Sequence, residues 1–377
     1  MHVSALSRVP VARARAQTPI LAAGLVSLAA YLLLQFVAPI WSLPYTAEMF
    51  EAGRIMQEAV AVTRAYCDSA GIGFDASIDP NRTCLIGPEY SELMTTLGHI
   101  EAKRTTTDPA VASLIVHLLT RAGVSRGDTI AIGASASFPA LLIASLAAAR
   151  AMGVFPISIV SLGASSYGAT NVEFNFLDLY RLLLREGIVE VPPAAVSLGG
   201  RDDAGSDFDP KLRSELIRQI EASGLRFFLE PDMRRNVAAR MRIYESADRA
   251  AVAAFVNTGG SHANLGTSPL ALEIQPGLNT DLSAPAEGER GVLFEMAARG
   301  VPVVHLLFIR GLALRHGLKW DPVPLSEPGE VSLFAEQAES RAALLLIGVP
   351  FFATLLALAA FATLRNRRTE TTPSTPD

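Results

Sequence analysis

Short apolar runs alternate with capped helical segments along most of the chain. Six of these runs predict strands: Thr129–Gly133, Phe155–Leu162, Ala194–Leu198, Leu225–Leu229, Val252–Asn257 and Val301–Leu307. Two of the intervening helices begin at an Asp-Pro pair (108–109 and 209–210), which is typical of a helix N-terminus. Strands that alternate with helices indicate βαβ units. The pattern therefore predicts an α/β fold with a doubly wound, mostly parallel sheet of about six strands.

The two ends of the chain have a different pattern. Residues 19–43 and 342–364 carry no charged side chain. A helix of about 20 apolar residues crosses a hydrocarbon core of roughly 30 Å, so we expect a transmembrane helix at each end. The alternative for the first segment is a cleaved signal peptide. Its apolar region would be about 7–15 residues long, and the segment 19–43 is longer than that.

Arginines flank these two segments on their outer sides. The tail 1–18 holds Arg8, Arg13 and Arg15, and the tail 365–377 holds Arg365, Arg367 and Arg368. Because basic residues favour the cytoplasmic side, we expect a two-pass protein of the cell membrane with both termini cytoplasmic. The part between the spans is then extracytoplasmic. It comprises a membrane-proximal helix and irregular segment (44–107), the α/β domain (108–320) and a tether (321–341).

Charge and cysteine content narrow the functions of the central part. The chain has a net charge of −5, and six of its basic residues lie in the two tails, so the central part is more acidic still. This excludes a nucleic-acid-binding surface, which needs a basic footprint. We find no spacing typical of a metal site or cofactor and expect neither. Cys67 and Cys84 either form a disulfide, which an oxidising compartment permits, or are two separate thiols.

Four predicted strands are each followed by a segment rich in glycine, serine or asparagine. The candidate ligand-binding residues in these segments are Ser135, Ser137, Ser165, Ser166, Tyr167, Gly199, Gly200, Asn257, Gly259, Gly260, Ser261 and His262. The carboxyl ends of parallel strands meet at one edge of a sheet, where α/β proteins bind ligands. We therefore expect a ligand site at that edge, although ordinary β–α turns also use glycine and serine.

The first of these loops is close to a nucleophile elbow. Residues 133–137 read Gly-Ala-Ser-Ala-Ser, with serine where G-x-S-x-G has its second glycine. Ser135 or Ser137 would be the nucleophile, His262 the base, and Asp202 or Asp203 the orienting acid. The alternative is that the two serines cap the following helix.

A further polar cluster lies in the segment Gly-His-Ile-Glu-Ala-Lys (98–103). In an extended conformation His99, Glu101 and Lys103 would share one face. Lys103 is of interest because a lysine amine changes its protonation readily when it is buried. The alternative is a solvated strand edge.

Seven short motifs, in this order, resemble the poly-γ-glutamate system proteins, a family of bacterial membrane proteins of capsule biosynthesis. They are Gly-His-Ile-Glu-Ala-Lys-Arg-Thr (98–105), Ile-Val-His-Leu-Leu-Thr-Arg-Ala-Gly-Val (115–124), Ser-Ala-Ser-Phe-Pro-Ala-Leu (135–141), Ser-Ser-Tyr-Gly-Ala-Thr (165–170), Ser-Leu-Gly-Gly (197–200), Pro-Gly-Leu-Asn (276–279) and Arg-Gly-Val-Pro-Val-Val-His-Leu (299–306). The similarity covers roughly residues 46–320.

This resemblance implies an accessory role in the synthesis, export or attachment of poly-γ-glutamate. Its implied partners are the membrane, the synthase subunits and the glutamyl polymer. It supplies no catalytic residues. The alternative function is a serine-dependent hydrolase or transferase that acts on γ-glutamyl amide bonds outside the cytoplasm.

Overall fold

The computed structural model describes residues 21–33, 45–245, 251–328 and 337–370. The chain divides into two units, of which Tyr45–Leu333 is one and the terminal segments Met1–Pro44 and Phe334–Asp377 together are the other. The unit Tyr45–Leu333 contains the sheet and the candidate site.

The central sheet of this domain has six strands. They are β2 (Thr129–Ser135), β3 (Phe155–Ser161), β5 (Ala195–Ser197), β6 (Val252–Asn257), β7 (Gly277–Asn279) and β8 (Val303–His305). Their order is β5-β3-β2-β6-β8-β7, and all neighbours are parallel except β7 and β8. The prediction of a mostly parallel α/β sheet of about six strands is confirmed.

One predicted strand is wrong. Residues Leu225–Leu229 form no strand, and only Phe227 makes an isolated bridge, to Val196 beside β5. Only Phe228 of this segment is buried, so the run lacks the two buried faces of an inner parallel strand. The sixth strand is instead β7, a short antiparallel edge that carries no apolar run.

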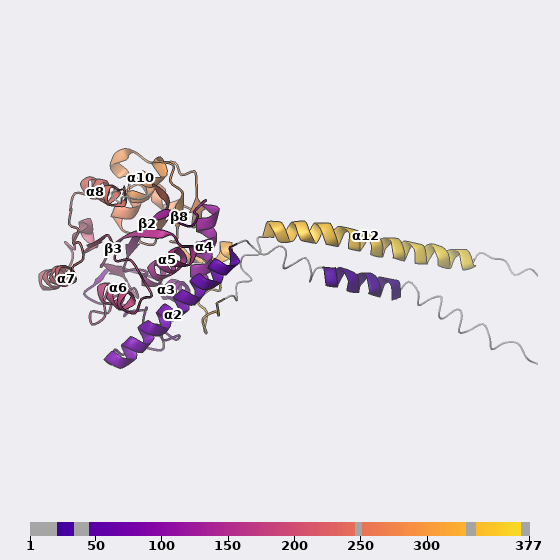
Figure 1. The fold of residues 1–377 in the computed structure, drawn as a ribbon, viewed down its shortest axis with the longest axis horizontal. Coiled ribbons are helices and arrows are strands. Elements are labelled where there is room, and N and C mark those ends of the chain that lie inside the picture. The colour runs from indigo at the N-terminus through magenta and orange to yellow at the C-terminus, as the bar shows by residue number, and fades with distance from the viewer. Residues whose placement is uncertain (1–20, 34–44, 246–250, 329–336, 371–377) are drawn as a thin grey trace, which may run out of the picture. The chain divides into compact units, whose positions relative to one another are not determined.

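Helices cover both faces of the sheet (Figure 1). On one face α5 (Pro139–Met152) packs on β2 and β3, with α4 (Ala110–Arg121) and α2 (Thr46–Ala70) against it. On the other face α8 (Met233–Glu245) and α10 (Val292–Ala298) enclose a core with the strands. The other α-helices described in this unit are α3 (Ile100–Thr106), α6 (Phe176–Arg185), α7 (Pro210–Ala222), α9 (His262–Leu265) and α11 (Ile309–His316). A separate pair of short strands, β1 (Met94–Thr96) and β4 (Ala164–Ser165), is parallel.

Both Asp-Pro pairs lie at the start of a helix: Asp209 is the N-cap of α7 as predicted, whereas α4 begins one residue later than predicted, with Pro109 as its N-cap. Asp108 Oδ1 accepts a hydrogen bond from Ala110 N (2.8 Å), and Asp209 Oδ1 accepts one from Lys211 N (2.8 Å). These bonds satisfy backbone donors that the first helical turn leaves unpaired. They stabilise the starts of α4 and α7.

Within the described residues, one helix is long and apolar enough to cross a membrane. It is Leu345–Leu364, which lies within α12 (Gln337–Glu370). At the other end the described helix is Leu21–Leu33. At about 1.5 Å per residue it reaches roughly 20 Å, less than a hydrocarbon core. The rest of the predicted first span, residues 19–20 and 34–43, lies outside the described residues. The structure therefore bears out a possible span at the C-terminal end, and the N-terminal span stays a prediction.

Part of the predicted tether is bound to the domain. Arg104 pairs with Asp321 (2.6 Å), Ser326 N donates to Asp108 Oδ2 (3.1 Å), and Asn81 Nδ2 donates to Pro322 O (2.8 Å). Residues 321–328 are therefore a surface segment of the domain rather than a free linker.

Cys67, near the end of α2, and Cys84 form a disulfide, which is one of the two arrangements that the sequence left open. The bond closes a loop of 17 residues that wraps from α2 back over its C-terminal half. The irregular segment after α2 is thereby tied to the helix.

Replacing both cysteines by alanine is expected to lower the free energy of unfolding by about 3 kcal/mol, because the unfolded chain gains the freedom of the open loop. Urea unfolding of the full chain in detergent, followed by circular dichroism, measures this change. A reductant should move the wild-type midpoint to that of the variant and leave the variant unchanged. Equal midpoints of wild type and variant without reductant would contradict the prediction.

Candidate functional site

The carboxyl ends of β2, β3, β5 and β6 border one cavity of about 450 Å³. From β2 the chain proceeds outward through β3 to β5, and then returns to the other side of β2 with β6 and β8. The cavity thus lies where the strand order reverses, which is where open α/β sheets bind ligands. Its wall is rich in hydroxyl groups, from Thr95, Thr96, Ser135, Ser137, Ser161, Ser165 and Ser261.

The four predicted loops meet in this cavity. The predicted residues in its wall are Ser135, Ser137, Ser165, Gly199, Gly200, Gly260, Ser261 and His262. Sequence reasoning missed the part of the wall formed by Thr95–Leu97. Thr95 and Thr96 belong to β1, and Leu97 follows it directly. The pairing of β1 with β4 brings them beside the loop after β3, and a strand of three residues leaves no periodic signal.

Other predicted residues lie off the cavity wall. Ser166 Oγ donates to Met94 Sδ (3.3 Å), and Tyr167 contacts Glu89. Asn257 is fully buried behind the wall, and Gly259 packs against Ser135.

The extended arrangement predicted for residues 99–103 is wrong. His99 is the N-cap of α3, and Glu101 and Lys103 are inside this helix. His99 is exposed and Glu101 is half-buried, whereas the Lys103 side chain is only 2 % exposed. The three side chains therefore share no face, and Lys103 is no part of a solvated edge.

The Lys103 amine lies between two of the cavity loops. Nζ donates to Ser165 Oγ at 2.6 Å and to the carbonyl oxygen of Ser137, and it lies 3.7 Å from the centroid of the Phe138 ring. No carboxylate pairs with it in the described part of the chain. Burial lowers the pKa of Lys103 to about 7, since the charged form is poorly solvated there.

Two glycines permit these contacts. A Cβ on Gly98 would lie 2.7 Å from Ser166 O and 3.2 Å from both Lys103 Cε and Ser165 Oγ. A Cβ on Gly259 would lie 2.9 Å from Ser135 N. Any side chain at either position would push the amine or the β2 loop away from the wall.

Several buried polar atoms have no hydrogen-bond partner among the described residues. Three of the residues concerned lie at the ends of β2 and β6, and Asn264 of α9 packs against Gly133 of β2. The atoms are Ser135 Oγ, Asn257 Oδ1, Thr258 Oγ1, Asn264 Nδ2 and Asn264 Oδ1. Each residue is at most 4 % exposed. Unpaired buried polar groups cost free energy and are rare in folded proteins. Of these residues Ser135 lines the cavity, so its hydroxyl is the unpaired group that a ligand there could reach.

His305, at the end of β8, contacts Asn257 of this cluster. Its Nδ1 is 3.1 Å from Asn257 Nδ2. Burial lowers the pKa of His305 to about 4, so the ring is neutral and its Nδ1 accepts the amide hydrogen. His305 is therefore a buried structural residue and no candidate base.

A buried ion pair holds the loop after β5. Arg240 Nη2 is 2.5 Å from Asp203 Oδ2, and both side chains are 1 % exposed. Asp203 also accepts hydrogen bonds from Ser197 Oγ (2.7 Å) and Asn236 Nδ2 (3.0 Å). This network holds residues 199–203, where Asp202 and Asp203 have positive φ, and so places Gly199 and Gly200 at the cavity.

The serine–histidine arrangement that the sequence suggested is not assembled. Ser135 Oγ has no partner among the described residues, and Ser137 Oγ accepts from Ser165 N (2.9 Å). His262 is exposed, and Asp203 is engaged by Arg240. The capping alternative is also wrong, because the N-cap of α5 is Phe138 and no side chain caps that helix.

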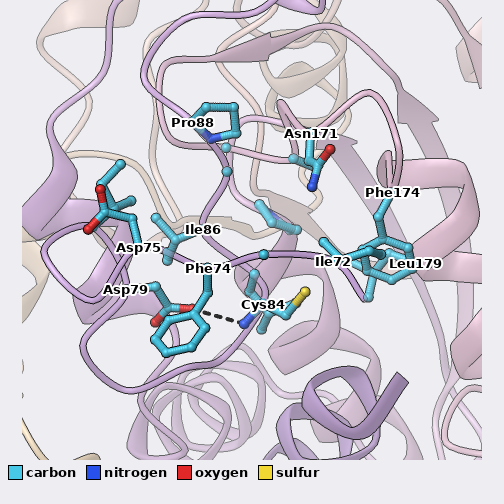
Figure 2. A pocket seen from close by; sticks show the side chains of 17 residues that line it. Ile72, Phe74, Asp75, Asp79, Cys84, Ile86, Pro88, Asn171, Phe174 and Leu179 are labelled. Carbon is cyan, nitrogen blue, oxygen red and sulfur yellow. Dashed lines mark hydrogen bonds between the residues drawn. The ribbon is translucent and has the colours of Figure 1, made fainter. Parts of the chain in front are cut away.

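A second pocket, of about 270 Å³, lies between residues 72–88 and the loop that leads to α6 (Figure 2). Its wall is mainly apolar, with Phe74 and Ile86 facing Phe174 across it. The Asp79 carboxylate there accepts a hydrogen bond from Cys84 N (2.9 Å). None of the residues predicted for the site lines this pocket, so the cavity at the strand ends is the candidate site.

The described residues contain no group of three or more His, Cys, Asp or Glu side chains that could hold a metal ion. No family model, curated protein or solved structure matches the chain. Function therefore has to be inferred from the cavity itself and from the motifs that surround it.

Replacing Arg240 by methionine should destabilise the domain by about 3–5 kcal/mol, because Asp203 would remain buried without its partner. Arg235, on the same helix but exposed, provides the matched control, and its replacement by methionine should change stability by less than about 0.5 kcal/mol. Chemical unfolding of the three full chains compares them. Equal losses in both variants would show that the pair does not hold this loop.

Proposed function

We propose that this protein is a membrane-anchored accessory component of poly-γ-glutamate synthesis, export or attachment. In this proposal the cavity binds a short segment of the glutamyl chain. The supporting observation is where the family-like motifs lie: those at 135–141, 165–170 and 197–200 contribute the cavity wall, and the one at 98–105 contributes Lys103. Sequence resemblance and cavity thus coincide in segments that are far apart along the chain.

The chemistry of the wall favours a chain end over a long run of the polymer. Its charged side chains are Arg201, Asp202 and Asp207, with His262 at the wall as well, so it offers no row of cations for a polyanion. Hydroxyl groups and backbone amides can hydrogen-bond to the amide bonds of a γ-glutamyl segment, and Arg201 can pair with one of the α-carboxylates that each glutamyl residue keeps. A volume of about 450 Å³ lies within the range of roughly 300–1,000 Å³ that small-molecule sites have.

We place the domain outside the cytoplasm, with both termini inside and two membrane passes. The arginines of the two tails support this orientation. The disulfide Cys67–Cys84 fits an oxidising compartment. At the outer face the domain would be next to the synthase subunits that we propose as its partners.

A second candidate function is a serine-dependent hydrolase or transferase acting on γ-glutamyl amide bonds. It is favoured by the contact between the Lys103 amine and the Ser165 hydroxyl at the cavity wall. Binding of the glutamyl segment is common to both functions, and it is therefore tested first.

A short γ-glutamyl oligomer should stabilise the full chain in detergent against heat. At about 100 times its dissociation constant the ligand contributes about 2.7 kcal/mol, which raises Tm by roughly 5–10 °C. An α-linked glutamyl oligomer of the same length and charge is the control ligand. Equal shifts with both oligomers, or no shift, would contradict the proposal.

Gly260→Leu tests whether the ligand binds in this cavity. A Cβ at Gly260 meets only Leu307 Cδ1, at 3.7 Å, so a leucine fits the backbone but occupies space at the cavity wall. We expect this variant to lose the stabilisation by the oligomer while its own Tm changes little. Gly288→Leu, on an exposed turn elsewhere, should keep the stabilisation.

A further inference from the structure

We infer that Ser165 and Lys103 form a nucleophile–base pair, and that the domain cleaves or transfers an amide bond through an acyl-enzyme on Ser165. The substrate class, γ-glutamyl amides, rests on the proposed function. The pair itself rests on geometry: Ser165 lines the cavity, and its Oγ lies 2.6 Å from Lys103 Nζ, which is buried behind the wall. This distance is within the reach that a general base needs.

The surroundings of the amine suit its neutral form. A neutral amine has two N–H groups and one lone pair. As an ammonium, Nζ donates to Ser165 Oγ. In the neutral form the carbonyl oxygen of Ser137 and the face of the Phe138 ring take up the two N–H groups, and the contact with Ser165 reverses, so that the lone pair accepts the hydroxyl hydrogen. The absence of a carboxylate partner among the described residues fits this role, because a carboxylate would keep the amine protonated.

Ser165 is held in place from two sides. Its backbone N–H donates to Ser137 Oγ at 2.9 Å, and its own strand β4 pairs with β1. Ser137 therefore touches both members of the pair, the serine through its hydroxyl and the lysine through its carbonyl oxygen. It is a positioning residue, which explains why the loop after β2 carries a second serine.

The reaction follows from these positions. Lys103 takes the Ser165 hydroxyl proton while Oγ bonds to the amide carbonyl carbon. The Lys103 ammonium then gives this proton to the leaving nitrogen, the C–N bond breaks, and the acyl group remains as an ester on Ser165. Water, or the amine of an acceptor molecule, attacks the ester. Lys103 takes the proton of the attacking group and returns it to Ser165 as the C–O bond breaks.

The competing explanation is that Lys103 only ties the loops together. A structural tie predicts a loss of stability without any effect on the reactivity of Ser165. A base predicts that the reactivity of Ser165 depends on Lys103 and on pH. Because burial brings the pKa of Lys103 to about 7, the reactivity should rise as the pH increases and reach half its maximum near pH 7.

A fluorophosphonate, which reacts with activated serines, tests the pair in the full chain in detergent. We expect the probe to label Ser165, as identified by peptide mass, with the pH profile just described. Ser165→Ala should abolish the labelling, and Lys103→Met should slow it by about 100-fold or more and remove its pH dependence. Ser145→Ala, a buried serine of α5 that donates to Leu141 O, should leave it unchanged.

Incubation with a γ-glutamyl oligomer, analysed by mass spectrometry, separates this inference from the proposed function. Cleavage by wild type, together with binding but no cleavage by Ser165→Ala, supports both. An oligomer that binds but stays intact, with Ser165 unlabelled, overturns the nucleophile–base pair and leaves the binding function standing. Lysine-dependent labelling of Ser165 without any binding of the oligomer supports the pair and overturns the substrate class.

Discussion

The burial of one amine without a countercharge is the constraint that shapes the candidate site. A charged group costs several kcal/mol to bring into a protein interior unless partners compensate it. Among the described residues the partners of the Lys103 amine are a carbonyl oxygen, a hydroxyl and an aromatic face. These come from the loops after β2 and β3, so the position of the amine requires both loops to converge, with Gly98 leaving the space between them.

A second buried cation in the same domain shows the contrasting arrangement. Arg240 is as deeply buried as Lys103, but it is paired with Asp203 and hydrogen-bonded to Asn236 and Ser197. A compensated guanidinium stays charged, and its function is to hold a loop of unfavourable backbone geometry. An uncompensated amine has a protonation state that depends on its surroundings and so is available for proton transfer. Arg240 thus supports a loop of the cavity, and Lys103 is the residue to which we assign a role in the proposed reaction.

The sequence predicted the sheet and the loops of the site well, because both depend on local signals. Apolar runs such as Val252–Asn257 and the Asp-Pro caps are readable without knowledge of the rest of the fold. Parallel strands bring their carboxyl ends to one edge of the sheet. Once the strands were predicted correctly, the loops with Ser135, Ser165, Gly199 and Ser261 were expected to lie together at that edge, and they line one cavity there.

The parts that the sequence did not predict depend on contacts between distant segments. The segment 99–103 alternates like a strand, yet it forms a short helix because burial of the Lys103 stem and the pairing of β1 with β4 outweigh the local pattern. Leu225–Leu229 reads as a strand, but only one of its side chains is covered by the core. The partner of Lys103 likewise depends on tertiary contacts, and so the likeness to G-x-S-x-G drew the prediction to Ser135 and Ser137 instead of Ser165.

The unpaired polar atoms beneath the cavity connect the binding site to the reaction. Ser135, Asn257, Thr258 and Asn264 lie where β2 and β6 separate, at the reversal of strand order. A fold selected for stability alone would fill this place with apolar side chains, since each unpaired group costs about 1–3 kcal/mol. Of these four residues Ser135 lines the cavity, so its hydroxyl is the group that a ligand there could reach. Ser165 lines the same cavity, so a ligand that pairs with Ser135 would lie in the space that Ser165 also borders. In the proposed reaction Ser135 would thus help to orient the bond that Ser165 and Lys103 attack.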